Sequence, residues 1–373
     1  MTTLRVILDE VGGEARTSLS WYGEELTRAL IETAPQGLDV TAFTAMISEQ
    51  RRARIRELLP GLTELEQAKL PAREMREAWL HRITTLPLTG LTHATSLFAP
   101  LRDHDADDGQ VVVTVHSAGP ISDRGTGKDR WFDKALKRAW KHADGVVVPS
   151  DAVATEISER YDFGERIRVI PGGVAPTIRV PDTADERARQ LGLPEQFVAV
   201  VTVHSSRQTG ADLVSLLADS AMPDIPVVVV GPVAWGEETL SGMAVSAGIP
   251  AARFVPVGEL DDSDLALVLS RASALVHLNR SDSFGLPILA AFSLGCPVVH
   301  VSTPSLDELA DGAALGVSSA PGAELSRPTA EGIRRLLEEE QLAGRLRDLG
   351  LDRARFYDWR TSAEQVWQFH AQL

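Results

Sequence analysis

Residues 281–299, SDSFGLPILAAFSLGCPVV, combine residue types and a spacing that suit an anionic ligand. Asp282 stands just before a short expected helix, in which Pro287 fits the first turn and which ends at Gly295. The backbone amides at a helix start carry partial positive charge, so they bind a phosphate without any charged side chain. Gly285 would let such a ligand approach the backbone closely. The pattern also fits an ordinary connection between two strands, and both interpretations stay open at this point.

Three other places hold residues with binding or catalytic chemistry, each directly after an expected strand. His116 ends QVVVTVH, Arg207 and Gln208 follow FVAVVTVHSS, and Gly12 and Gly13 follow the first strand. Ligands of open α/β sheets bind beyond the carboxyl ends of the strands, which is where these residues would lie. Each also has a structural explanation, because a histidine forms hydrogen bonds within a fold and a glycine pair forms a tight turn.

The two phosphate-binding motifs with fixed spacing are not met. The loop after the first strand is no G-x-G-x-x-G, which argues against a dinucleotide-dependent dehydrogenase. RGTGKD at 124–129 has Asp129 where a phosphate-binding loop requires Ser or Thr, and it lacks the first glycine of that motif.

Strand-like apolar runs alternate with helical runs along the chain. They include QVVVTVH and DGVVVPS in the first half, and FVAVVTVH, IPVVVVGP and CPVVHVS in the second. Short, continuous apolar runs are typical of strands buried on both faces of a parallel sheet. A stretch with three prolines, between residues 173 and 194, separates the two series. The sequence therefore predicts two Rossmann-like, doubly wound α/β domains that face a cleft.

The amino-acid composition excludes several classes of binding partner and cellular location. The 37 Lys and Arg residues against 52 Asp and Glu give a net charge of −15. Nucleic acid and anionic membrane surfaces select basic proteins, so neither is expected as a main partner. We see no apolar run of the ~18–20 residues that a membrane span requires, and no secretory leader. With one cysteine, Cys296, a disulfide framework within the chain is excluded, and a cytoplasmic location is expected.

Several segments, in this order, resemble the retaining glycosyltransferases of family 4, which have the GT-B fold. VTVHSAGP resembles the strand and histidine that end the sheet of that family's first domain. RAWKHADGVVVPSDAVATEI and RIRVIPGGVAP resemble the segments that lead into its interdomain linker. Residues 281–299 resemble its donor-site signature, two acids eight positions apart around a Phe-Gly-Leu-Pro turn. FYDWRTSAEQV is similar to its terminal helix, so the resemblance covers nearly the whole chain.

The resemblance implies an acceptor domain at 1–180, a nucleotide-sugar donor domain at 181–355, and a C-terminal helix at 356–373 that crosses back to the first domain. It implies a nucleotide sugar as donor, a glycan or small molecule as acceptor, and no cofactor or metal. His116 and Asp282 are the implied catalytic residues, the first touching the sugar or the departing phosphate and the second binding a sugar hydroxyl. The implied donor-binding residues are Gly12, Gly13, Arg207, Gln208, Arg280, Ser283, Phe284, Gly285, Leu286 and Ala290.

The chain departs from the family pattern at the donor site. Ala290 stands where the second acid of the signature would hold the ribose hydroxyls, and Gln208 replaces a lysine that meets the diphosphate. Thr202 stands where part of the family has an arginine. A carboxylate-to-hydroxyl hydrogen bond contributes ~1.5–3 kcal/mol, so loss of the acid alone would weaken donor binding roughly 10- to 100-fold. Arg207, Arg280 and the helix-start amides are left to bind phosphate.

Two functions are consistent with this pattern. The first, which we favour because the ordered motifs are preserved, is a metal-independent, hexosyltransferase-like enzyme that retains configuration. The second is a non-catalytic protein of the same fold that binds a glycan or a catalytic partner, and the substitutions favour it. Either function allows a protein partner or a second copy of the chain. Titration with nucleotide diphosphates distinguishes the enzyme from the non-catalytic protein.

Overall fold

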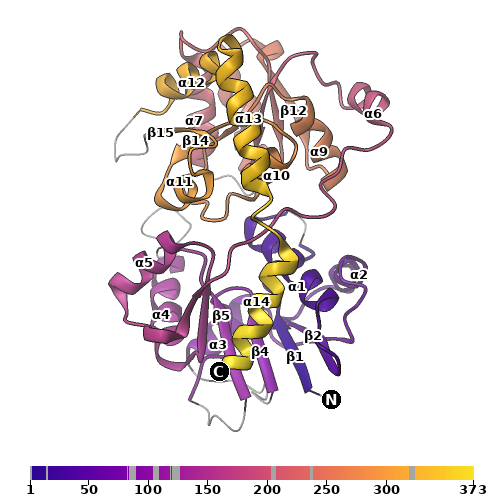
Figure 1. The fold of residues 1–373 in the computed structure, drawn as a ribbon, viewed down its shortest axis with the longest axis vertical. Coiled ribbons are helices and arrows are strands. Elements are labelled where there is room, and N and C mark those ends of the chain that lie inside the picture. The colour runs from indigo at the N-terminus through magenta and orange to yellow at the C-terminus, as the bar shows by residue number, and fades with distance from the viewer. Residues whose placement is uncertain are drawn as a thin grey trace. The chain divides into compact units, whose positions relative to one another are not determined.

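The computed structural model describes residues 2–13, 16–81, 83, 90–103, 109–117, 119, 127–202, 207–235, 238–318 and 324–373. The chain forms two compact units, which we call unit 1 (Met1–Gly172 with Asp358–Leu373) and unit 2 (Gly173–Tyr357). Each unit has a parallel sheet with helices packed against it, so the predicted fold class is confirmed (Figure 1). The units divide after Gly172 and Tyr357, where the sequence had placed the divisions after residues 180 and 355. The amide of Val174 donates to Tyr357 O at 3.1 Å and so joins the two ends of unit 2.

The sheet of unit 1 has the order β3-β2-β1-β4-β5-β6-β7, and all its pairs are parallel. Because β1 pairs with both β2 and β4, the strand order reverses at β1, which makes this the topological switch point of unit 1. Val111, Val112 and Val113 are fully buried, as expected for a strand covered on both faces. The strands are β1 Thr2–Ile7, β2 Leu38–Thr44, β3 Glu64–Gln67, β4 Gly90–Ala94, β5 Gly109–Thr114, β6 Gly145–Val148 and β7 Ile167–Val169.

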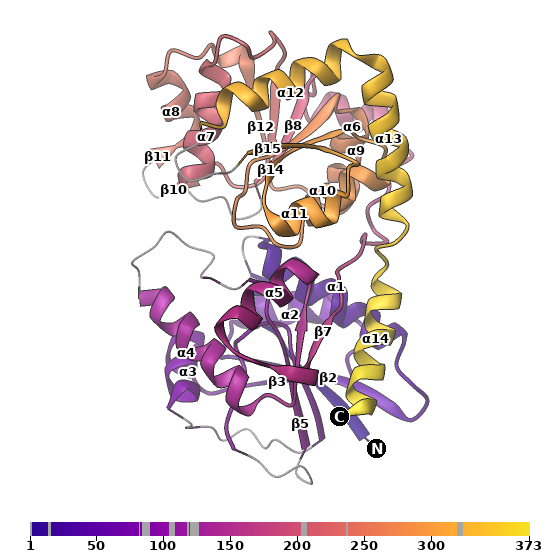
Figure 2. The ribbon, with the colours of Figure 1, turned by 60° about the vertical axis from the view of Figure 1, so that its left-hand side comes forward.

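The helices of unit 1 include the C-terminal one. Helix α14 lies beside α1 in both views (Figures 1 and 2), and Trp367 Nε1 donates to Leu30 O at 3.3 Å. Helix α1 begins with a capping box, in which Thr17 and Ser20 exchange side-chain and backbone hydrogen bonds. The helices are α1 Ser18–Glu32, α2 Glu49–Leu58, α3 Ala72–Leu80, α4 Gly127–His142, α5 Asp151–Arg160 and α14 Trp359–Gln372, with a 3-10 turn at Gly164–Arg166.

The sheet of unit 2 has the order β12-β9-β8-β13-β14-β15, again with all pairs parallel. Strand β8 pairs with both β9 and β13, so the switch point of unit 2 lies between β8 and β13. The strands are β8 Val198–Val201, β9 Val227–Val230, β12 Phe254–Gly258, β13 Ala274–His277, β14 Val298–Ser302 and β15 Leu315–Ser318, and a separate antiparallel pair joins β10 Ala234–Trp235 to β11 Glu238–Thr239.

Close helix packing supports this sheet. Helices α10 and α13 lie side by side, and a Cβ on Gly350 of α13 would come within 2.8 Å of the Phe292 ring of α10 (Figure 2). No helix in the described part of the chain is long and apolar enough to cross a membrane. The helices of unit 2 are α6 Ala184–Gln190, α7 Arg207–Ala218, α8 Leu240–Ser246, α9 Asp262–Arg271, α10 Leu286–Ser293, α11 Pro304–Ala310, α12 Ser326–Glu338 and α13 Glu340–Ala354, with a 3-10 turn at Ala251–Arg253.

Candidate functional site

The segment between β13 and α10 holds most of the residues that the sequence predicted to bind the donor. It leaves the carboxyl end of β13 at the switch point of unit 2, where ligands of doubly wound sheets bind. The predicted residues that the structure brings together here are Arg280, Asp282, Ser283, Phe284, Gly285, Leu286 and Ala290.

The Asp282 carboxylate organises this segment from a buried position, with its side chain only 1% exposed. Its Oδ1 accepts hydrogen bonds from the amides of Phe284 at 2.9 Å and Gly285 at 3.0 Å. Its Oδ2 lies 3.1 Å from Nε2 of His277, the last residue of β13. Burial alone would raise the pKa of Asp282, but His277 and the two amides together lower it below its ordinary value. The carboxylate is therefore charged at neutral pH and holds the loop in shape.

The start of α10 is shaped by packing. Gly285 has φ +59, and a Cβ there would lie 2.4 Å from Cδ2 of Leu309 in α11. The left-handed backbone and the packing against Leu309 thus favour a glycine here whether or not a ligand approaches it. Since Asp282 engages the amides of Phe284 and Gly285 and Pro287 has no N–H, the first-turn donors that a phosphate would meet belong to Leu286 and Ile288.

Ala290 lies inside the fold, with 2% of its surface exposed, and every residue of α10 from Leu286 to Phe292 is buried. A glutamate at this position would put a carboxylate where a buried methyl group now packs. The departure from the family signature therefore agrees with the local packing of this helix.

Arg280 is the predicted donor-site cation whose side chain the structure describes. It is 34% exposed, and its Nη2 lies 3.7 Å from Asp212 Oδ2 in α7. Arg207 and Gln208 begin α7 at the same switch point, but their side chains lie outside the described residues.

Thr202 directly follows β8 and forms hydrogen bonds that stabilise the sheet. Its Oγ1 lies 2.9 Å from Val230 O and 3.1 Å from Pro232 O, so it links the end of β8 to the end of β9. A Cβ on Gly231, at φ +106, would lie 2.3 Å from Thr202 O, which explains the glycine.

His116 is buried in unit 1, just after β5, with 5% of its surface exposed. Its Nε2 lies 2.5 Å from Thr95 O, and its ring meets the Tyr22 ring edge-on with centroids 4.8 Å apart. Because a carbonyl only accepts, Nε2 carries the hydrogen of this bond. Burial lowers the pKa of His116 to about 4, so the ring is neutral at pH 7.

The glycine-rich loop after β1 is fixed by α2. Gly12 has φ +69, and a Cβ there would lie 2.8 Å from Ile55 Cγ1. Arg51 Nε donates to Val11 O at 2.9 Å, and the amide of Gly13 donates to Glu10 O at 3.1 Å. Packing against α2 thus accounts for Gly12 without a ligand.

Sequence reasoning missed a buried acid at the switch point of unit 1. Asp9, two residues after β1, is 7% exposed, and burial raises its pKa. Arg76 Nη2 lies 3.1 Å from both of its carboxylate oxygens, and Ser96 Oγ donates to Oδ2 at 3.2 Å. Glu10 beside it has φ +64, which is uncommon for a residue other than glycine. The signal in the sequence was an acid pair directly after the first strand, in LRVILDE.

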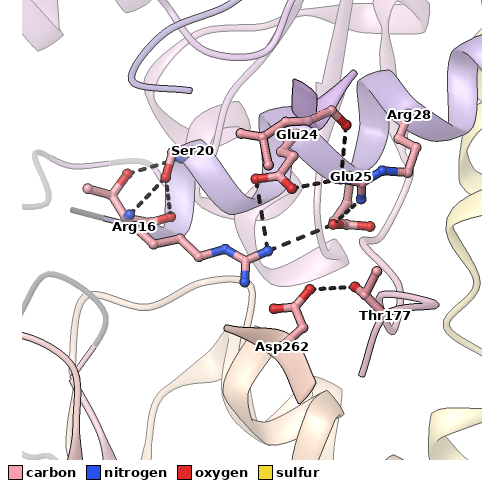
Figure 3. Close-up of polar contacts among 9 residues, drawn as sticks. Arg16, Ser20, Glu24, Glu25, Arg28, Thr177 and Asp262 are labelled. Atoms are coloured by element: carbon pink, nitrogen blue, oxygen red, sulfur yellow. Dashed lines mark hydrogen bonds and ion pairs between the residues drawn. The ribbon is translucent and has the colours of Figure 1, made fainter. Parts of the chain in front are cut away.

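A second polar group that sequence reasoning missed lies on α1 (Figure 3). Arg28 bonds to Glu25, whose side chain is 1% exposed, and to Glu24 at 2.7 Å. Arg16 reaches back toward the same two acids, at 3.8 Å and 4.0 Å, with its guanidinium 4.3 Å from the Trp21 ring centroid. These contacts join the loop before α1 to the middle of the helix.

Two sequence families together match most of the chain. Residues 20–177 match the family described as Glycosyltransferase Family 4, and residues 184–351 match Glycosyl transferases group 1.

The named relatives that match the chain share less than 30% of its sequence. A D-inositol 3-phosphate glycosyltransferase of a Nocardioides species is 27% identical over 245 residues, which are 60% of this chain and 52% of that protein. The matched part thus spans about half the length of that relative. A D-inositol 3-phosphate glycosyltransferase of Frankia alni is 28% identical over 397 residues, covering 96% of this chain and 95% of that protein. Among solved structures, HepE of Anabaena in complex with UDP-glucose covers 100% of both chains with a TM-score of 0.73 at 17% identity, which shows a shared fold.

Proposed function

Because the chain belongs to the family 4 and group 1 glycosyltransferases with the GT-B fold, we propose that it transfers a sugar from a nucleotide sugar to an acceptor with retention of configuration. The transfer is proposed to need neither a metal nor an organic cofactor. UDP sugars are the first donors to test, because the similar HepE of Anabaena is described in complex with UDP-glucose.

The observation that carries the proposal is the switch point of unit 2. There a buried, charged Asp282 holds the segment after β13, and the partly exposed Arg280 lies in the same segment. A diphosphate bound beyond β8 and β13 would meet Arg280, Arg207 and the first amides of α10. Fixed cations and amides of this kind stabilise the negative charge that grows on a leaving diphosphate.

The roles of the remaining predicted residues follow from their geometry. Asp282 acts as a positioning residue in this proposal, because both its oxygens face groups of the protein. His116 keeps its predicted contact with the transferred sugar.

A second candidate function is a non-catalytic protein of the same fold that binds a glycan or a catalytic partner. The substitution at Ala290 favours it, because this buried alanine offers no carboxylate to the ribose hydroxyls of a donor. The two candidates differ in whether a nucleotide binds and is turned over.

The proposal is tested by calorimetric titration of the full chain with UDP, GDP and ADP. We expect one of them to bind and Arg280→Gln to weaken that binding roughly tenfold, as for loss of one charge-assisted hydrogen bond. Arg271→Gln is the matched control, because Arg271 is 37% exposed and precedes the amino end of β13, whereas Arg280 follows its carboxyl end. Failure of all three nucleotides to bind would rule out the donor site and leave the second candidate.

A further inference from the structure

A buried tyrosine of α1 packs against the candidate catalytic residue His116. The ring of Tyr22 meets the His116 ring edge-on, with centroids 4.8 Å apart, an arrangement that aromatic rings favour. Tyr22 is 1% exposed, and its hydroxyl forms a hydrogen bond with the side chain of Thr114, the last residue of β5. Because His116 follows Thr114 by two residues, Tyr22 contacts both the imidazole ring and the strand that carries it.

Helix α14 supports Tyr22 from its first turn. Trp359, the first residue of this helix, is buried and meets the Tyr22 ring edge-on, with centroids 5.3 Å apart. The same turn is bonded to the segment after β7, because Ser362 Oγ donates to Pro171 O at 2.7 Å. Helices α1 and α14 lie side by side, so this contact is part of a longer interface (Figure 2). The first turn of α14 therefore fixes one side of the tyrosine ring.

The last turn of α14 reaches the same group through β4. The rings of His370 and His93 are in edge contact, with centroids 5.6 Å apart, and His93 Nε2 lies 3.2 Å from Thr114 Oγ1. Thr114 thus joins His93 to the hydroxyl of Tyr22. Burial lowers the pKa of His93, His116 and His370, so all three rings are neutral at pH 7 and pack as uncharged groups.

We propose that Tyr22 is a positioning residue for His116. Helix α14 holds Tyr22 at two points, directly through Trp359 and indirectly through His370. The orientation of the imidazole matters for catalysis, because a misplacement of about 1 Å can lower a rate roughly 100-fold. Residues 358–373 then belong to the catalytic arrangement of unit 1. An effect on turnover rests on the proposed function, whereas the support of the His116 ring does not.

The ring contact is tested without any substrate by Tyr22→Leu. The smaller side chain leaves space beside His116, and water enters it because the imidazole and Thr114 are polar. Water removes part of the burial that lowers the pKa of His116, so this pKa should rise from about 4 toward its ordinary 6.5. At pH ~5 the protonated fraction of the ring should therefore increase several-fold, from roughly one-tenth in the wild type.

NMR titration of the imidazole protons in the full chain measures this fraction, and the signal that is lost in His116→Gln belongs to His116. Tyr22→Phe keeps the ring and should retain the wild-type signal. Phe163→Leu is the matched control, because Phe163 is a 2% exposed aromatic residue of the same unit that follows α5. It should leave the His116 signal unchanged.

The role of α14 is tested by Trp359→Leu, which should shift the His116 signal in the same direction as Tyr22→Leu but less. Trp367→Leu is its control on the same helix, because Trp367 is also buried but bonds through Nε1 to Leu30 O at 3.3 Å. It should loosen the helix without changing the His116 signal. Thermal unfolding confirms that each variant is folded, and Trp359→Leu carries the test if Tyr22→Leu is not.

Turnover of a UDP sugar links the contact to catalysis. Tyr22→Leu should lower kcat roughly tenfold or more at a nearly unchanged Kd for UDP, and Tyr22→Phe should restore most of the rate. A loss of UDP affinity equal to the loss of kcat would contradict a role in positioning His116, as would an unchanged kcat.

Two results of the titration would overturn the inference. Either the His116 signal in Tyr22→Leu and Trp359→Leu is that of the wild type, or Tyr22→Phe and the two controls shift it as much. The titration also keeps the two proposals separate. A shifted signal in a chain that turns over no nucleotide sugar would refute the proposed function and keep Tyr22 as the support of the His116 ring. Turnover with no shift would refute the role of Tyr22 alone.

Discussion

Removal of the Asp282 carboxylate is predicted to destabilise the segment that begins α10. In Asp282→Ala the amides of Phe284 and Gly285 lose their acceptor in a region where Phe284 is 6% exposed. A buried donor left without an acceptor costs ~1–3 kcal/mol, so the two together cost ~2–6 kcal/mol. The contact with His277 is lost as well.

Asp282→Asn is the matched variant, because an amide oxygen can still accept both N–H groups. It removes the charge that faces His277, and hydrogen bonds to a neutral acceptor are weaker by roughly 1 kcal/mol each. We therefore expect about half the loss seen for alanine. A contact between Asp282 and the sugar would show separately, as lost turnover in Asp282→Asn at nearly full donor affinity.

Hydrogen-exchange mass spectrometry measures this effect locally. Peptides that cover 278–293 should exchange faster in Asp282→Ala by an amount that corresponds to several kcal/mol, whereas peptides of unit 1 serve as the internal reference. A loss of less than about 1 kcal/mol in those peptides would refute the assignment of Asp282 as a positioning residue.

Three further predictions concern stability. The pKa of His116 is lowered from 6.5 to about 4, so on acidification the unfolded chain takes up a proton before the folded chain does. The free energy of unfolding should therefore fall by up to about 3 kcal/mol between pH ~6.5 and ~4. In His116→Gln the free energy of unfolding should depend less on pH across this range, which unfolding curves measured at several pH values will show. Gly285→Ala should lower the free energy of unfolding by ~2–5 kcal/mol, because of the left-handed backbone and the overlap with α11. Gly37→Ala should lower it by only ~1–2 kcal/mol, because φ there is +85 but a Cβ meets nothing within 4 Å. Equal losses of stability in denaturant unfolding would contradict this prediction. Arg28→Ala should lower the free energy of unfolding by ~3 kcal/mol, because it leaves the buried Glu25 without its bonded partner. Arg16→Ala should lower it by less than ~1 kcal/mol, because its contacts with the two acids are longer. Similar denaturation midpoints for the two variants would be inconsistent with the contacts on α1.

The fold class was predictable because its signal is local. Runs such as VVVV at 227–230 are buried on both faces, and their alternation with helical runs specifies parallel sheets. The segment at 281–299 was also found from sequence, since its turn and helix start are consecutive residues.

The partners within the site were not predictable, because they are distant in sequence. Arg76 bonds to Asp9, 67 residues earlier in the sequence, and the residues around either one give no sign of this ion pair. The glycines show the same limit. Gly12 and Gly285 were interpreted as places of ligand approach, but a Cβ at each would overlap Ile55 or Leu309, and only tertiary packing reveals that.

The central claim is that this chain transfers sugar from a nucleotide sugar with retention. The most direct measurement is NMR observation of the anomeric proton while the purified chain is incubated with a UDP sugar and a candidate glycan or small-molecule acceptor. We predict that UDP accumulates together with a glycoside or free sugar formed in the anomeric configuration of the donor. A donor that binds but stays intact would contradict the claim of catalysis, and a product of inverted configuration would contradict retention.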